Sequence, residues 1–236
     1  GVWKNIVLEE KTKPAESLAE FRANYKYNLL DSNLRAFNAA VPMLAQWDDH
    51  EVTNNWWPEE PLTRAEHVRK KYQDKFVLGM VARAGRAFHE YMPTRQFIIE
   101  PARVYRKVSY GPLLDVFMLD MRSYRAANGA NTQETYGPDA HFLGPQQVAW
   151  LKKGLKDSKA TWKVIAADMP IGLIVVYDGA KNFGSEAIAQ GDGKPLGREL
   201  EIVVEDATAT PEPGTLALLC AGLAGVAGSL RRRKNA

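Results

Sequence analysis

Apolar residues recur at three- and four-residue spacing in the first part of the chain, a pattern typical of amphipathic helices. It predicts a helix over residues 14–30, with Pro14 in the first turn, where a helix tolerates proline. The polar stretch 31–33 ends this helix and caps a shorter one over 33–40. The apolar positions of the first helix are Leu18, Phe21, Tyr25 and Leu29.

The same spacing predicts one long helix over residues 63–91, ended by Pro93. Thr63 and Glu66 have the spacing of a capping box at its start. His67 and His89 are expected on its exposed surface. Its apolar positions are Val68, Tyr72, Phe76, Val77, Met80, Ala84 and Phe88. A last amphipathic helix is predicted over 145–157, opened by Gly144-Pro145.

Short apolar runs between the helices predict strands. Residues 41–45 read as a short buried strand, 104–110 and 114–119 as the two arms of a hairpin, and 162–167 as a third strand. Residues 173–177 form a further apolar stretch. The recurring order of strand, polar residues and helix predicts an α/β or α+β sandwich with its site at the strand ends.

Residues 46–56, here called the acidic segment, follow the predicted strand 41–45 and carry the strongest candidate chemistry. Asp48, Asp49, His50, Glu51, Asn54 and Asn55 fall within eight positions. Oxygen and imidazole donors that directly follow a strand are how many α/β enzymes build a metal site. An acidic turn explains a lone Asp-Asp-His equally well. Solvated turns, however, rarely contain three tryptophans within eleven residues, as 47–57 do.

Such donors suit Ca²⁺, Mg²⁺, Mn²⁺ or Fe³⁺. These ions clamp phosphoryl oxygens and lower the pKa of a coordinated water, and a nearby histidine can protonate the leaving alkoxide. Two more candidates follow predicted strands. Asp168 follows 162–167, while Asp120 and Arg122 follow 114–119 and form either part of a site or a structural ion pair.

Charge and cysteine content narrow the possible functions. The net charge is +3, but residues 231–234 supply four positive charges, so the rest of the chain carries −1. No nucleic-acid-binding surface is therefore expected. The single cysteine, Cys220, excludes disulfides and a zinc–thiolate site within this chain. The chain opens at Gly1, which indicates either a removed export signal or a start partway through a longer product.

The composition changes after residue 202. Residues 203–213 are polar and contain two prolines, as expected of a linker. Thr215–Leu230 is uncharged and mostly small or apolar, and four basic residues follow it. Its sixteen residues fall slightly short of the ~20 that span a bilayer, a gap that snorkelling arginines can close. Residues 214–236 are thus predicted to be a transmembrane helix with a cytoplasmic basic tail.

The tail, Pro211-Glu212-Pro213, then an apolar stretch, then Arg231-Arg232-Arg233, resembles the Pro-Glu-Pro C-terminal (PEP-CTERM) sorting signal of Gram-negative bacteria. The resemblance implies export and processing by an exosortase. The upstream part would be anchored to the inner membrane and face the periplasm, or reach the cell surface or the medium after the tail is processed.

Residues 1–202 resemble the alkaline phosphatase D family of metallophosphoesterases. The resemblance is carried by Trp47-Asp48-Asp49-His50-Glu51 with Asn54-Asn55, by Leu119 to Arg125, by Leu143 to Gln147 with Trp150-Leu151, by Trp162-Lys163-Val164 and by Gly191-Asp192-Gly193. It implies a phosphatase or phosphodiesterase with a calcineurin-like β-sandwich flanked by helices, present here in part.

The resemblance also implies roles for single residues. Asp49, Asn54 and Asp168 would be metal ligands, His50 the phosphate partner or general acid, and Arg122 a substrate contact. The metals would be Ca²⁺ together with Fe³⁺, or else Mn²⁺ or Mg²⁺, and the substrate a phosphate ester.

This chain also departs from the family pattern. An aspartate-containing first motif and a Gly-Asp-x-x-Tyr motif are missing upstream, and an Asp-Val-His motif is missing downstream. A binuclear site needs about six to eight protein donors, and three or four remain here. The alternative is therefore a non-catalytic, surface-displayed remnant of the fold. Its sheet would lack the first strands and expose an apolar edge.

Overall fold

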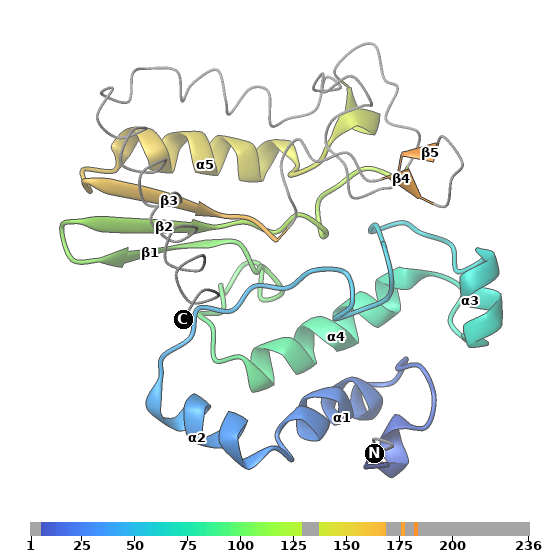
Figure 1. Ribbon diagram of the computed structural model, residues 1–236. Coiled ribbons are helices and arrows are strands. Elements are labelled where there is room, and N and C mark those ends of the chain that lie inside the picture. Colours follow the sequence, from blue (N-terminus) through green and yellow to red (C-terminus); the bar gives the residue numbers. More distant parts are fainter. Residues whose placement is uncertain (1–5, 129–136, 169–175, 178–181, 184–236) are drawn as a thin grey trace, which may run out of the picture. The chain divides into compact units, whose positions relative to one another are not determined.

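The computed structural model describes residues 6–128, 137–168, 176–177 and 182–183, all within one compact unit formed by residues 1–200 (Figure 1). The predicted linker and tail, and most of the apolar stretch 173–177, lie outside the described residues. Among the described helices, none is long and apolar enough to cross a membrane.

A three-stranded sheet has the order β1 (Arg106–Tyr110), β2 (Leu114–Met118), β3 (Trp162–Ala166). β1 and β2 are antiparallel, and β2 and β3 are parallel. In this register Val116 of β2 pairs with Val108 of β1 on one side and with Val164 of β3 on the other. The chain returns from β2 to β3 through the 3₁₀ turn η2 (Pro138–Ala140) and helix α5 (Pro145–Asp157). The predicted hairpin, last helix and third strand are confirmed. The described strands β4 (Val176–Tyr177) and β5 (Asn182–Phe183) form a separate antiparallel pair.

Helix α5 packs directly on the sheet (Figure 1). A Cβ atom at Gly154 would lie 2.6 Å from Cε1 of Phe117, so only glycine permits this approach between helix and strand. Gly144, before the first turn of α5, has φ 79°, and a Cβ there would lie 2.8 Å from Cβ of Tyr124. These two glycines fix α5, and with it Gln147, against the ends of the strands.

Strand β3 is an edge of the sheet as far as the structure describes it. Trp162, Val164 and Ile165 are exposed along it. Whether strands missing from a partial sheet would cover this edge stays a prediction.

The N-terminal part is helical: η1 (Glu9–Lys11), α1 (Leu18–Asn28), α2 (Ser32–Ala40), α3 (Ala65–Lys70) and α4 (Val77–Tyr91). Helix α1 begins four residues later than predicted because Ser17 and Glu20 form a capping box. Asp31 caps α2, accepting a hydrogen bond from the Asn33 amide at 2.7 Å. Helices α1 and α4 lie side by side (Figure 1).

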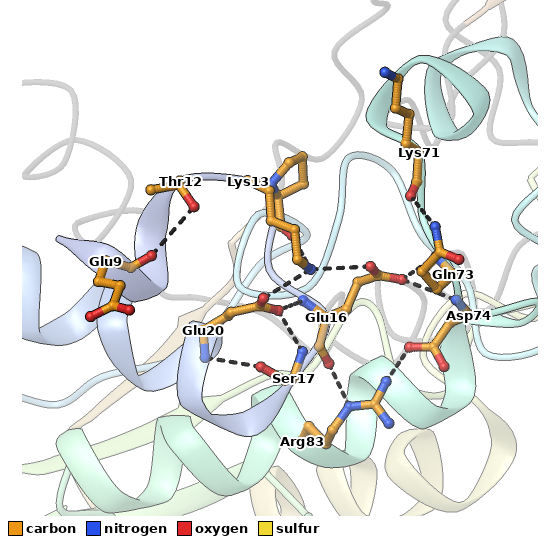
Figure 2. Close-up of polar contacts among 11 residues, drawn as sticks. Glu9, Thr12, Lys13, Glu16, Ser17, Glu20, Lys71, Gln73, Asp74 and Arg83 are labelled. Carbon is orange, nitrogen blue, oxygen red and sulfur yellow. Dashed lines mark hydrogen bonds and ion pairs between the residues drawn. The ribbon is translucent and has the colours of Figure 1, made fainter. Parts of the chain in front are cut away.

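The prediction of one helix over 63–91 is wrong, because the chain breaks between α3 and α4. Lys71 adopts a left-handed conformation with φ 56°. Oε1 of Glu16 accepts hydrogen bonds from the amides of Gln73 at 2.5 Å and Asp74 at 3.0 Å, as Figure 2 shows. These amides would otherwise be available to a continuing helix. The predicted Thr63–Glu66 capping box is also absent, since the N-cap residue Arg64 makes no side-chain cap hydrogen bond.

Glu16 joins three segments through its main chain and side chain (Figure 2). Besides the two amides, its carboxylate meets Lys13 at 3.3 Å, and its carbonyl accepts a hydrogen bond from Nε of Arg83 in α4 at 2.5 Å. Arg83 also pairs with Asp74. The break after α3 therefore depends on a residue far earlier in the chain.

Replacing Glu16 by alanine should lower the free energy of unfolding by about 1–3 kcal/mol, because two backbone amides lose their acceptor. Urea denaturation followed by circular dichroism would measure this. Glu9→Ala is the matched control, since the Glu9 side chain is exposed, and it should change stability by less than about 0.5 kcal/mol. Equal effects of the two substitutions would contradict this role of Glu16.

The prediction of a buried strand over 41–45 is also wrong. Val41, Met43 and Leu44 are exposed, and the segment has no strand partner among the described residues. Instead, the carbonyl of Ala45 accepts a hydrogen bond from Nη2 of Arg106 at 2.6 Å. The acidic segment is therefore fixed by its own tryptophans and not by a preceding strand.

Candidate active site

Two buried tryptophans anchor the acidic segment. Trp47 and Trp56 meet edge to face with ring centroids 5.7 Å apart, and Trp47 lies 5.9 Å from Phe88 of α4. Because one ring holds each end of the segment, the polar residues between them are held near the surface of the helical core.

Asp48 brings Arg122 and Asp168 together. Nε of Arg122 lies 2.7 Å from Oδ1 of Asp48, and Gln46 donates a hydrogen bond to Oδ1 of Asp168 at 3.3 Å. Burial, and then the charge of Asp48, raise the pKa of Asp168 to about 8. Two carboxylates from distant parts of the chain thus lie close together, with one guanidinium beside Asp48.

This pair fits a cation. Oδ2 of Asp168 and Oδ2 of Asp120 are buried without a hydrogen-bond partner. The Asp48 side chain is 42% exposed, so only the Asp168 end of the pair is shielded from water. A shielded carboxylate beside a second carboxylate costs free energy unless a proton or a cation lies between them. Across the described ranges, no three His, Cys, Asp or Glu side chains are grouped closely enough to hold a metal ion. An ion at Asp48 and Asp168 would thus need further oxygen ligands, such as water or substrate.

Asp49, a predicted metal ligand, closes a turn. Its Oδ2 accepts a hydrogen bond from the amide of Asn55 at 2.7 Å, and its carbonyl accepts one from the amide of Val52 at 2.9 Å. Asn55 has a φ of 53°, a conformation that asparagine tolerates. Nη2 of Arg122 lies 3.7 Å from the same Oδ2 of Asp49.

His50 and Asn54 form a second group. The His50 side chain is 75% exposed, and its Nε2 lies 3.1 Å from Oδ1 of Asn54 and 3.8 Å from Oδ2 of Asp49. Asn54 donates a hydrogen bond to Glu66 at 3.0 Å. His50 and Asn54 also line a cavity of about 770 Å³. The structure therefore places Asp168 and Arg122 each beside Asp48, and His50 with Asn54, and Asp49 has contacts in both groups.

The alternative of an Asp120–Arg122 ion pair is wrong, because the Arg122 side chain pairs with Asp48 and Asp49 instead. Oδ1 of Asp120 accepts hydrogen bonds from the amides of Arg122 at 3.1 Å and Ser123 at 2.9 Å. The side chain of Gln147 bonds both the amide and the carbonyl of Asp120, each at 2.8 Å. Asp120 thus sets the backbone from which Arg122 projects.

Sequence reasoning missed an ionisable cluster next to the acidic segment, here called the Glu60 cluster: the buried Glu60 and His67 and the partly exposed Arg64. Nε of Arg64 lies 2.5 Å from Oε1 of Glu60, and Nε2 of His67 lies 3.7 Å from the same atom. Burial raises the pKa of Glu60 to about 7 and lowers that of His67 to about 4. The prediction that His67 is exposed is wrong, and His89 is only partly exposed, with Nδ1 2.8 Å from Oγ1 of Thr94.

The Glu60 cluster supports the acidic segment. Nη2 of Arg64 donates a hydrogen bond to the carbonyl of Asn54 at 2.7 Å and lies 3.1 Å from Nε2 of His67. Only the spacing of four residues from Glu60 to Arg64 and three from Arg64 to His67 hinted at it. Asp48 was also overlooked in favour of Asp49. In the structure Trp47 and Asp49 are buried and Asp48 between them is partly exposed, a difference that the two adjacent aspartates do not reveal in the sequence.

The described fold is of the α/β class, with carboxylates and an arginine gathered where the acidic segment meets the end of β3. The sequence profile of the PhoD-like phosphatases matches residues 1–218, and the chain belongs to this family. This confirms the resemblance found in the sequence. A PEP-CTERM protein-sorting motif matches residues 209–233.

Two relatives show how much of the family the chain spans. Alkaline phosphatase D of Bacillus subtilis (strain 168) is 33% identical over 199 residues, an alignment that covers 78% of this chain and 31% of the relative. A solved structure of PhoD superposes with a TM-score of 0.57 and 28% identity, covering 81% of this chain and 36% of the other. The chain thus spans about a third of the length of these relatives.

Proposed function

We propose that this chain takes part in metal-dependent hydrolysis of phosphate esters, as an alkaline phosphatase or phosphodiesterase. The observation that carries the proposal is the Asp48–Asp168 pair, with its unpartnered oxygen and with Arg122 beside it. Carboxylates that need a cation, next to a guanidinium that can bind phosphoryl oxygens, are the elements such a reaction requires.

The residues divide the work as follows. Asp168 and Asp48 would hold a metal ion, with Asp49 and Asn54 as further candidate ligands. When bound, the ion supplies Lewis-acid polarisation of the phosphoryl group and acidifies water. Arg122, with a side chain 1% exposed and paired to Asp48 and Asp49, would contact a phosphoryl oxygen through Nη1, which has no hydrogen-bond partner. The exposed imidazole of His50 would donate the proton that the leaving alkoxide needs. The oxygen donors suit Ca²⁺, with Fe³⁺, Mn²⁺ or Mg²⁺ as alternatives.

The finer architecture and location belong to the same proposal. Residues 1–202 would be part of a calcineurin-like β-sandwich, residues 203–213 a linker, and 214–236 a transmembrane helix with its basic tail. The sorting motif supports export and processing by an exosortase. The hydrolase part would then face the periplasm or be displayed or released outside the cell.

The test is hydrolysis of p-nitrophenyl phosphate at alkaline pH by the full chain supplied with Ca²⁺. A chelator should abolish the reaction, and Asp168→Asn should lower kcat/KM about 100-fold, because one carboxylate of the pair becomes neutral. Asp157→Asn is the matched control. Asp157 lies on the exposed side of α5, paired with Lys153, and its replacement should leave the rate unchanged. An unchanged rate of hydrolysis in the presence of the chelator would contradict the proposal.

A non-catalytic surface protein is the second candidate. The observation that favours it is that Arg122 already neutralises Asp48 and faces Asp49, which leaves less negative charge for a metal. This candidate predicts weak divalent binding and no hydrolysis. Calorimetry that finds tight, stoichiometric Ca²⁺ binding by this chain would exclude it.

A further inference from the structure

Two adjacent cavities lie beside His50, the N-terminal segment and α3, and together they are treated as one groove. It consists of two cavities of about 770 and 670 Å³ that share Lys13, Pro14, Glu66 and Lys70 among their lining residues. Each cavity lies within the size range of small-molecule sites. We call it the lysine groove, after its cationic lining residues Lys11, Lys13, Arg69, Lys70 and Lys71.

The lysine groove carries an excess of positive charge. Its lining contains five cationic residues but only two carboxylates, Glu51 and Glu66. Glu66 pairs with Lys70 at 2.7 Å, and Lys13 pairs with Glu16 and Glu20 outside the lining. Arg69 and Lys71 are exposed. A concave surface with this balance attracts anions.

One end of the groove also offers aromatic rings and amides. Tyr25, Tyr27 and Tyr72 line the larger cavity, together with Asn24 and Asn28. Nζ of Lys11 lies 5.3 Å from the centroid of the Tyr27 ring and donates a hydrogen bond to Asn24 at 2.8 Å. Lys11 lies over Tyr27, and Tyr25 stacks on Tyr91 with ring centroids 5.1 Å apart, so these rings already have partners. A bound aromatic group would pack beside them, with the Lys11 ammonium facing its charge and the exposed amide of Asn28 its polar atoms.

We propose that the lysine groove binds a negatively charged aromatic group, of which a nucleotide is the simplest natural example. His50 and Asn54 form one edge of the same cavity, so an ester phosphate at His50 would extend its leaving group into the groove. The placement of a substrate's leaving group in the groove rests on the proposed hydrolysis, whereas the binding of a nucleotide there does not.

The experiment separates the two. The full chain is titrated in EDTA with adenosine 5′-monophosphate by calorimetry, and separately with adenosine and with inorganic phosphate. The nucleotide should bind at least tenfold more tightly than either half alone, and its binding should weaken as salt is raised. Since no metal or turnover is needed, a failure of hydrolysis leaves this result readable. Equal affinities for nucleotide and phosphate, or no nucleotide binding at millimolar concentration, would overturn the proposal.

Substitutions of groove residues test whether the nucleotide binds in the lysine groove. Lys11→Glu reverses a charge at the groove and should weaken nucleotide binding about tenfold. Lys26→Glu is the matched control, because Lys26 is exposed on α1, lies 3.9 Å from Glu10 and does not line the groove; binding should not change. Asn28→Asp, at an exposed lining residue, adds a negative charge and should also weaken binding, which preserves the test if Lys11→Glu does not fold. Equal effects of the groove and control variants would overturn the proposal.

Discussion

Replacing Trp56 by alanine is expected to lower the free energy of unfolding by about 3–5 kcal/mol. Trp56 is fully buried and meets Trp47 edge to face, so the substitution leaves a large cavity in the helical core. It also frees one end of the acidic segment, which should loosen Asp48 and His50 together. Urea denaturation followed by far-UV circular dichroism measures the loss of stability.

Trp162→Ala is the matched control for this substitution. Trp162 lies on β3 and is 48% exposed, so the same change of residue removes about half as much buried surface and should cost about 1–2 kcal/mol, clearly less than Trp56→Ala. If the two alanine variants were equally stable, Trp56 would not be an anchor of the acidic segment.

Elements with a clear repeat in their own sequence could be predicted. The hairpin β1–β2, helix α5 and strand β3 form where the pattern of apolar residues placed them. A buried face explains the pattern of α5 and β2, whereas β3 is largely exposed and is recognisable only as a short apolar run. The break after α3 could not be predicted in this way. It depends on Glu16, whose carboxylate accepts hydrogen bonds from the backbone amides of Gln73 and Asp74. These residues lie 57 and 58 positions later in the chain. The local sequence around residues 63–91 cannot indicate a contact with a residue so far away in the chain.

The candidate site shows the same division. The acidic segment could be recognised because its donors are neighbours in sequence, yet the structure gives Asp49 to a turn and Asp48 to the carboxylate pair. Asp168 lies 122 positions from Gln46, its hydrogen-bond partner, so only the fold shows which carboxylate it meets. The apolar run 41–45 misled the prediction, because hydrophobicity alone supplies no strand partner.

Replacing Glu60 by glutamine is expected to make the protein's stability less sensitive to pH. Burial raises the pKa of Glu60 in the folded state to about 7, against 4.5 for a free side chain. An acid with a raised folded pKa contributes stability below its unfolded pKa and loses it as pH rises through the folded value. The wild-type chain should therefore lose about 3 kcal/mol relative to Glu60→Gln between pH 4.5 and pH 8. Urea denaturation of both proteins across this range measures the difference.

Charges around Glu60 act in both directions, and the raised pKa is their balance with burial. Arg64 favours the ionised carboxylate and Glu66 disfavours it, while His67, with a pKa lowered to about 4, is uncharged above pH 5. Glu59→Gln, at the exposed neighbouring position, is the matched control and should follow the wild-type pH profile. Parallel profiles for Glu60→Gln and the wild type would show that Glu60 stays ionised in the fold. Arg64, which holds the carbonyl of Asn54, would then be fixed by a full ion pair at every pH in this range.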